Sequence, residues 1–156
     1  METKIGITTE NRNTGVQKLC KLLADEYVLY TKTRNAHWNV EGYDFYNKHL
    51  FFEQQYGELD EIIDSVAERI RTLGHYAPAT LKDFLNLTQL TETKSEANDS
   101  IGFIKELLID HESIIIFLRE NIDFYTDLKD YGTSDFITGL METHEKMAWM
   151  LRSHIK

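Results

Sequence analysis

Apolar residues recur at helical spacing through four long segments of this 156-residue chain, and only one proline, Pro78, stands among them. Side chains three and four residues apart share one face of an α-helix, so this spacing predicts long amphipathic helices. The expected helices cover residues 14–39, 44–73, 93–128 and 134–154, with a short helix at "PATLKDFLN". No segment shows convincing strand alternation. The predicted fold is therefore all-α, an antiparallel four-helix bundle with a short extra helix between its second and third long helices.

The ends of these helices carry recognisable signals. Gly42 and Gly74 are expected to terminate the first and second helices, and Thr93 with Glu96 forms a possible capping box for the third. The opening segment "METKIGITTENR", residues 1–12, lacks strong periodicity and is expected to be a flexible tail. At 156 residues the chain has the length of one domain, so we expect residues 1–156 to form a single domain.

Composition narrows the classes of function. The net charge is −9, from 17 basic and 26 acidic residues, which argues against broad attraction to nucleic acid and fits a protein that attracts cations. The single cysteine, Cys20, excludes an internal disulfide framework and suits a reducing compartment, so we expect a cytoplasmic location. No apolar run approaches the ~20 residues of a membrane span, and no membrane association is expected.

The second predicted helix carries two pairs of potential metal ligands. His49 and Glu53 are four residues apart, and so are Asp64 and Glu68, which places each pair on one helix face. Fifteen residues separate the pairs, which corresponds to a rotation of ~60° and a rise of ~22 Å along a helix. The pairs thus lie on nearly the same stripe but too far apart to share a metal ion.

Two copies of this helix, packed antiparallel about a two-fold axis near Gly57, would bring the first pair of each chain to the second pair of the other. His37 ends the preceding helix and could fold back beside His49. Such a set of imidazoles and carboxylates suits iron, manganese or zinc rather than calcium. The alternative is a solvated, salt-bridged helix face without a metal.

A di-iron site within one chain is the obvious competitor. Such sites use Glu-x-x-His pairs on facing helices, yet none of the six histidines here has glutamate three residues before it. We therefore favour the shared site. His111 and His144 lie in the middle of predicted helices and are expected to be structural hydrogen-bonding groups.

Two stretches, "AHWNVEGYDFYNKHLFFE" and "DSVAERIRTLGHYAPATLKDFL", resemble the Dps family of mini-ferritins, also called DNA-binding proteins from starved cells. The similarity includes His-Trp followed by Gly and Phe, a second histidine twelve residues after the first, and Asp-x-x-Ala-Glu-Arg. Its core covers residues 34–85, and the helix pattern extends it over nearly the whole chain.

The resemblance implies a ferritin-like subunit that assembles into a hollow homododecamer with a ferroxidase centre at each two-fold interface. It implies that His37, His49 and Glu53 of one subunit join Asp64 and Glu68 of another around two iron ions, for which zinc or manganese could substitute. The implied enzyme oxidises Fe²⁺ with hydrogen peroxide or dioxygen, stores ferric mineral and protects the cell from oxidative damage. Glu53 stands where many relatives have aspartate, and Leu50 where glutamate often follows the second histidine.

Further roles are expected for residues near this centre and at the last interhelical connection. Trp38 matches the family's tryptophan beside the site, and it could intercept stray oxidising equivalents together with Tyr43 and Tyr46; the alternative for all three is packing in the core. In the resembled family, the connection before the last helix lines three-fold pores, for which Asp135 is our first candidate and Asp130 our second.

Direct DNA binding is the family property that this sequence supports least. Relatives that bind DNA commonly use a mobile lysine-rich tail, whereas residues 1–18 carry a net charge of only +1. A nucleoid-binding stress protein with secondary ferroxidase activity remains the alternative function. A helical bundle with a purely structural role is the third interpretation.

Overall fold

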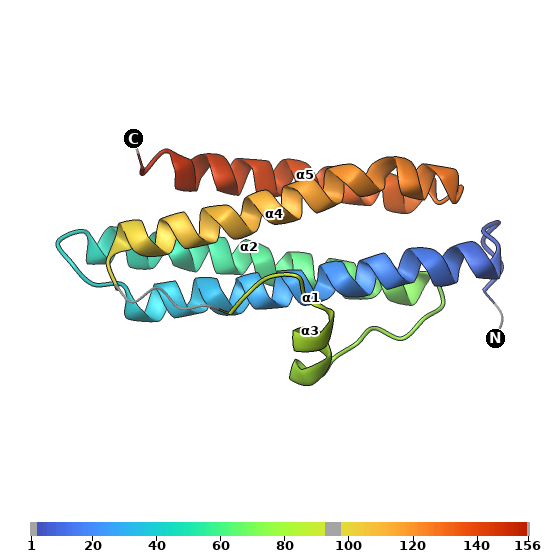
Figure 1. Ribbon diagram of the computed structural model, residues 1–156, viewed down its shortest axis with the longest axis horizontal. Helices are drawn as coiled ribbons and strands as arrows, with labels where there is room; N and C mark the ends of the chain where they lie inside the picture. The colour runs from blue at the N-terminus through green and yellow to red at the C-terminus, as the bar shows by residue number, and fades with distance from the viewer. Residues whose placement is uncertain (1–2, 93–97, 156) are drawn as a thin grey trace.

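The computed structural model describes residues 3–92 and 98–155, and this part of the chain forms five α-helices and no strand. The helices are α1 (Thr9–Asn39), α2 (Phe45–Thr72), α3 (Leu81–Leu87), α4 (Ser100–Asp127) and α5 (Tyr131–Arg152). In Figure 1, α1 and α2 form one antiparallel layer and α4 and α5 form the other, while the short α3 lies outside the bundle beside α1. The predicted four-helix bundle with a short extra helix is therefore confirmed.

The first helix begins earlier than the sequence predicted. The Thr8 side chain accepts a hydrogen bond from the Asn11 backbone N–H and caps the helix, and the Asn11 amide donates to the Leu128 carbonyl at 2.9 Å. Arg12 also donates to the Ile7 carbonyl at 2.7 Å. These hydrogen bonds hold residues 9–12 in the helix. The last four residues of the predicted tail therefore belong to α1.

Helix capping also sets the starts of α4 and α5. The predicted capping box, Thr93 with Glu96, lies outside the described residues; α4 begins at Ser100, where Asp99 caps it by accepting from the Gly102 N–H. Asp130 caps α5 in the same way, so that helix begins three residues before the predicted start. The predicted terminators Gly42 and Gly74 do have positive φ angles, +122° and +90°, which glycine adopts without steric penalty.

The apolar faces of the four long helices meet in one core. Its largest fully buried side chains come from α1, α2 and α4 and from the residue that ends α2: Leu19, Leu22, Leu23, Leu29, Phe52, Leu59, Ile70, Leu73, Ile104, Leu107, Ile114 and Tyr125. Side chains of this size each contribute roughly 1.5–3 kcal/mol on burial. This core fixes the relative positions of the helices that carry the candidate ligands. None of the described helices combines the length and the apolar character needed to cross a membrane.

A chain of three polar side chains interrupts the core. The His111 and His144 Nδ1 atoms are 2.9 Å apart, and His144 Nε2 lies 2.9 Å from Glu26 Oε1, with all three residues fully buried. One Nδ1 must donate and the other must accept. The two rings therefore cannot both be in the cationic form, in which both ring nitrogens carry a proton. Burial, followed by the proximity of His144, lowers the pKa of His111 well below its usual value. The predicted structural role of both histidines is thus confirmed.

This buried chain makes stability depend on pH. The unfolded protein binds a proton at His111 below about pH 6.5, whereas the folded protein does not, so the free energy of unfolding falls as the pH is lowered through this value. The contribution is up to about 1.4 kcal/mol per pH unit. In guanidinium denaturation at pH 7 and pH 5, His111→Gln should lose less stability on acidification than the wild type. The same substitution at His75, which is not part of the buried chain, is the matched control. An unchanged pH dependence in His111→Gln would contradict this prediction.

Candidate metal centre

The corner between α1 and α2 brings two histidines together. His37 lies in the last turn of α1 and His49 in the first turns of α2, and each ring Nδ1 is 2.8 Å from the backbone carbonyl oxygen of the other residue. The two rings stack with centroids 3.8 Å apart and an interplanar angle of 20°. The predicted return of His37 to His49 is confirmed, and the link between them is reciprocal.

These hydrogen bonds determine which ring nitrogens are available. A carbonyl oxygen can only accept, so Nδ1 of both His37 and His49 must carry the proton. In a neutral ring Nε2 then holds the lone pair, and neither Nε2 has a hydrogen-bond partner among the described residues. An imidazole whose Nδ1–H is fixed by a carbonyl oxygen is the usual arrangement of a metal-ligating histidine. The corner thus presents two oriented imidazole donors.

Aromatic rings and one guanidinium group lie near this histidine pair. The Tyr56 ring meets His37 edge-on at 5.1 Å, the Phe45 ring lies 5.2 Å from His49, and the Arg34 guanidinium is 4.4 Å from the centre of the Tyr56 ring. Neither Tyr56 nor Arg34 was predicted from the sequence to lie at this site. A signal was available, because Tyr56 is seven residues after His49 and Arg34 is three before His37, spacings that keep each on its histidine's helix face.

The predicted carboxylate ligands are spread along α2. Glu53, Asp64 and Glu68 are all exposed, and the last two lie about four and about five helical turns beyond His49. Among residues 3–92 and 98–155, no three His, Cys, Asp or Glu side chains are close enough to hold a metal ion. The structure therefore brings together His37 and His49, and the grouping of all five ligands stays a prediction.

Near the middle of α2, a Cβ atom added at Gly57 would meet nothing within 4 Å, so this chain's own packing does not require glycine there.

The corner is also tied to the start of α4. The Glu41 backbone N–H donates to the Asn98 carbonyl at 2.9 Å, and the Ser100 hydroxyl donates to the Asp44 carboxylate at 2.8 Å. Val40, the residue before Glu41, is buried. The α1–α2 corner is thus bonded to the opposite layer of the bundle, which holds the histidine pair in a fixed position.

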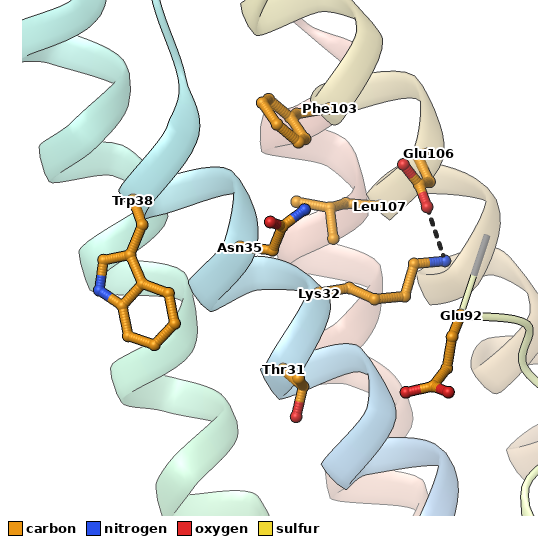
Figure 2. A pocket seen from close by; sticks show the side chains of 8 residues that line it. All are labelled: Thr31, Lys32, Asn35, Trp38, Glu92, Phe103, Glu106 and Leu107. Carbon is orange, nitrogen blue, oxygen red and sulfur yellow. Dashed lines mark ion pairs between the residues drawn. The ribbon is translucent and has the colours of Figure 1, made fainter. Parts of the chain in front are cut away.

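A pocket of about 250 Å³ lies between α1 and α4, close to this corner (Figure 2). Lys32, one of its charged groups, is already paired, because its Nζ atom is 3.1 Å from Glu106 and 2.5 Å from Asp110, and it also donates to the Thr91 carbonyl at 3.0 Å. Burial raises the pKa of Asp110, an effect that Lys32 partly opposes. The pocket therefore contains an ion-pair network that links α1 to α4, and the histidine pair is the better candidate centre.

The three aromatic residues proposed as electron traps are not core residues. Trp38 is 63% exposed, Tyr46 70% and Tyr43 fully exposed, so packing in this chain's core is the wrong interpretation for all of them. The Trp38 ring lies at one edge of the pocket in Figure 2, and the Arg34 guanidinium is 5.0 Å from its centre. Such exposed aromatic surface beside a candidate centre is typical of a contact with another molecule.

The two pore candidates differ sharply. Asp135 is exposed, but Asp130 is only 3% exposed and its carboxylate is fully engaged. It caps α5, accepts from the Thr133 hydroxyl at 2.6 Å, and forms an ion pair with Arg69 at 2.8 Å. The expectation that Asp130 lines a pore was wrong, because these bonds fix its carboxylate inside the subunit, where it joins α2 to α5. A pore role for Asp135 stays a prediction.

Known proteins match this chain over most of its length. The family model for the ferritin-like domain matches residues 16–156. A low temperature-induced protein of Nostoc is 44% identical over 153 residues, covering 97% of this chain and 86% of that protein. DNA protection during starvation protein 2 of Bacillus anthracis is 34% identical over 140 residues, covering 90% and 95%.

Solved structures give the same result. The Dps protein of Vibrio cholerae, described as a member of a broad superfamily of ferritin-like diiron-carboxylate proteins, superposes with a TM-score of 0.94 at 29% identity, covering 100% of this chain and 98% of that one. Dps of Thermosynechococcus elongatus superposes with a TM-score of 0.90 at 29% identity, covering 95% and 94%.

The chain therefore belongs to the ferritin-like family. Within that family it is a Dps protein, since both its sequence relatives and its structural neighbours carry that assignment over almost the full chain.

The different roles assigned to Asp130 and Asp135 can be tested by matched substitutions. Asp130→Ala leaves Arg69 without its buried partner and removes the cap of α5, so the free energy of unfolding should fall by about 2–4 kcal/mol, a figure that allows for the partial exposure of Arg69. Asp135→Ala should change it by less than ~0.5 kcal/mol. Guanidinium denaturation followed by circular dichroism measures both. Equal stability losses would contradict the structural role of Asp130.

Proposed function

We propose that this protein is a ferroxidase of the mini-ferritin type, which oxidises Fe²⁺ and stores the ferric product inside a hollow dodecamer. The observation that supports it most directly is the histidine pair, in which each Nδ1–H is donated to a carbonyl oxygen and Nε2 is left without a partner in the described chain, one helical turn from Glu53 for His49. Neutral imidazoles and a few carboxylates suit iron that must be bound, oxidised and released. The membership of the ferritin-like family supports iron binding in general.

Each complete centre would be shared by two subunits. The Asp64 and Glu68 side chains extend from α2 into solvent, about four and about five turns from His49 and on nearly the same stripe. An antiparallel contact between two α2 helices would bring them to His37, His49 and Glu53 of the other chain. The open face at Gly57 suits a close approach near the midpoint.

The proposed reaction follows from having two ferrous ions in one centre. Hydrogen peroxide needs two electrons and two protons to become two water molecules, and two Fe²⁺ ions supply both electrons as they become Fe³⁺. The reaction then avoids the one-electron step that releases a hydroxyl radical. The chain's own contribution is orientation, because the hydrogen bonds of His37 and His49 fix both rings before a metal ion arrives.

Subunit mixing tests the shared centre. Homogeneous His49→Ala and Asp64→Ala proteins should each lose most of their peroxide-dependent Fe²⁺ oxidation, measured anaerobically by ferric absorbance. When the two variants are dissociated and reassembled together, paired subunits regain some intact centres, so part of the activity should return. A mixture of His49→Ala with His37→Ala is the matched control, since both defects then fall in the same half of the centre. No recovery despite proven mixing would place the ligands within one chain.

DNA protection is the second candidate, because several relatives carry it in their names. The net charge of −9 per subunit argues against direct binding, since affinity for DNA rises with the number of phosphates that basic residues neutralise. We therefore expect no gel shift of linear duplex DNA at micromolar protein, even at low salt. A protein–DNA complex that dissociates as the salt concentration rises would favour the nucleoid-binding function instead.

A further inference from the structure

A second pocket between α1 and α4, also of about 250 Å³, is lined mainly by polar side chains. Lys18 and Lys21 of α1 form one side, Gln89 of the segment that follows α3 forms another, and Ser113 and Asn121 of α4 form the third. None of these residues belongs to the candidate metal centre. The volume is below the roughly 300–1,000 Å³ of sites that hold drug-sized molecules, so the pocket suits a small ion or group.

The two lysines are held at this pocket without being neutralised. Lys21 Nζ donates to Gln89 Oε1 at 2.7 Å and lies 4.9 Å from the centre of the Phe117 ring. Lys18 Nζ lies 5.9 Å from the centre of the same ring and 5.6 Å from that of Phe124. An aromatic ring attracts a cation but carries no net charge. Neither ammonium group forms an ion pair with a carboxylate of the described chain, so both charges are left for an anion.

The side of the pocket formed by Gln89 is fixed by a buried carboxylate. Asp25 of α1 is fully buried, and its Oδ1 atom accepts from the Thr88 hydroxyl at 2.6 Å and from the Gln89 backbone N–H at 2.8 Å. These hydrogen bonds hold the segment after α3 against α1 (Figure 1). Because Gln89 Oε1 accepts from Lys21, the amide N–H groups of Gln89 are left to donate to a ligand. A pocket formed in advance lowers the entropic cost of binding.

Asn121 supplies an acceptor rather than a donor. This residue is only 6% exposed, and its amide nitrogen donates to the Phe117 carbonyl at 2.6 Å, so Oδ1 is the polar atom that it presents to the pocket. At neutral pH phosphate exists as H₂PO₄⁻ and HPO₄²⁻, and both forms carry an O–H that can donate to this oxygen. Sulfate carries none and would leave the acceptor unpaired, which is unfavourable for a buried polar atom.

We propose that this pocket is a binding site for inorganic phosphate. Lys18 and Lys21 neutralise the charge of the anion, Ser113 and Gln89 donate hydrogen bonds to its oxygens, and Asn121 accepts from its O–H. A free ion can enter a pocket of this volume, whereas the phosphates of a nucleic-acid duplex are fixed along a convex backbone. The site goes beyond the proposed ferroxidase function, because it uses none of the candidate metal ligands.

Calorimetric titration of the assembled, metal-free protein with inorganic phosphate tests the site. At pH 7 and about 0.15 M sodium chloride, where distant charges are screened, phosphate should bind saturably with one ion per subunit. Sulfate should bind roughly ten-fold more weakly, because it cannot pair with the Asn121 oxygen. Absence of saturable phosphate binding, or sulfate binding as tight as that of phosphate, would overturn the assignment.

Substitutions of opposite effect test the residues. Lys18→Gln and Lys21→Gln each remove one charge and should weaken phosphate binding roughly 5–10-fold. Glu120→Gln removes the like charge of an exposed carboxylate that also lines the pocket, so it should strengthen binding roughly two-fold. Lys105→Gln, at an exposed position of α4 outside the pocket, is the matched control and should bind phosphate as the wild type does. Unchanged affinity in both lysine variants of the pocket would contradict the proposal.

The remaining outcomes are also decisive. Damage to the fold cannot produce both weaker binding in Lys18→Gln and tighter binding in Glu120→Gln, so these two variants suffice if Lys21→Gln disturbs the segment after α3. A duplex DNA that binds through Lys18 and Lys21 while free phosphate does not would overturn the phosphate site in favour of a nucleic-acid contact. The titration contains no iron, so its result is separate from success or failure of the ferroxidase function.

Discussion

The antiparallel pairing of α1 with α2 is the constraint on which the rest of this structure depends. Its closed end is held by two reciprocal hydrogen bonds, each from a histidine ring to the backbone carbonyl of the other histidine. Backbone carbonyls move only with their helices, so the position of each ring is set by the helix opposite. The same pairing aligns Tyr56 with Tyr30 and His37. The donor pair and its aromatic surroundings are therefore consequences of one helical hairpin.

Charge is distributed unevenly over this framework. Buried or half-buried carboxylates such as Glu26, Asp110 and Asp130 each have a partner on another helix, and these pairs join α1 to α5, α1 to α4 and α2 to α5. The carboxylates of Glu53, Asp64 and Glu68 remain exposed on α2. The chain thus uses one set of acidic groups to connect its helices and keeps another set available on its surface, which is how a net charge of −9 fits both roles.

The sequence predicted the helices and the proximity of His37 to His49 because both depend on local spacing and on one glycine-containing corner. It misassigned Asp130, since an acidic residue in a short connection looks the same whether it faces solvent or caps the next helix and pairs with Arg69. It also missed Tyr56, whose spacing to His49 indicated a shared helix face but whose contact with His37 depends in addition on the register of the two helices. The chain between Glu26, His144 and His111 joins three helices and has no local pattern at all.

That buried chain also limits how such a sequence can change over evolutionary time. Removing Glu26, His144 or His111 alone leaves the remaining polar atoms buried without a partner, at roughly 1–3 kcal/mol each, whereas exchanging the whole set for apolar side chains of similar volume can be nearly neutral. Intermediate sequences are therefore less stable than either end state. Among related proteins the three positions should be retained together or replaced together, and this covariation should occur independently of the residues at the metal centre.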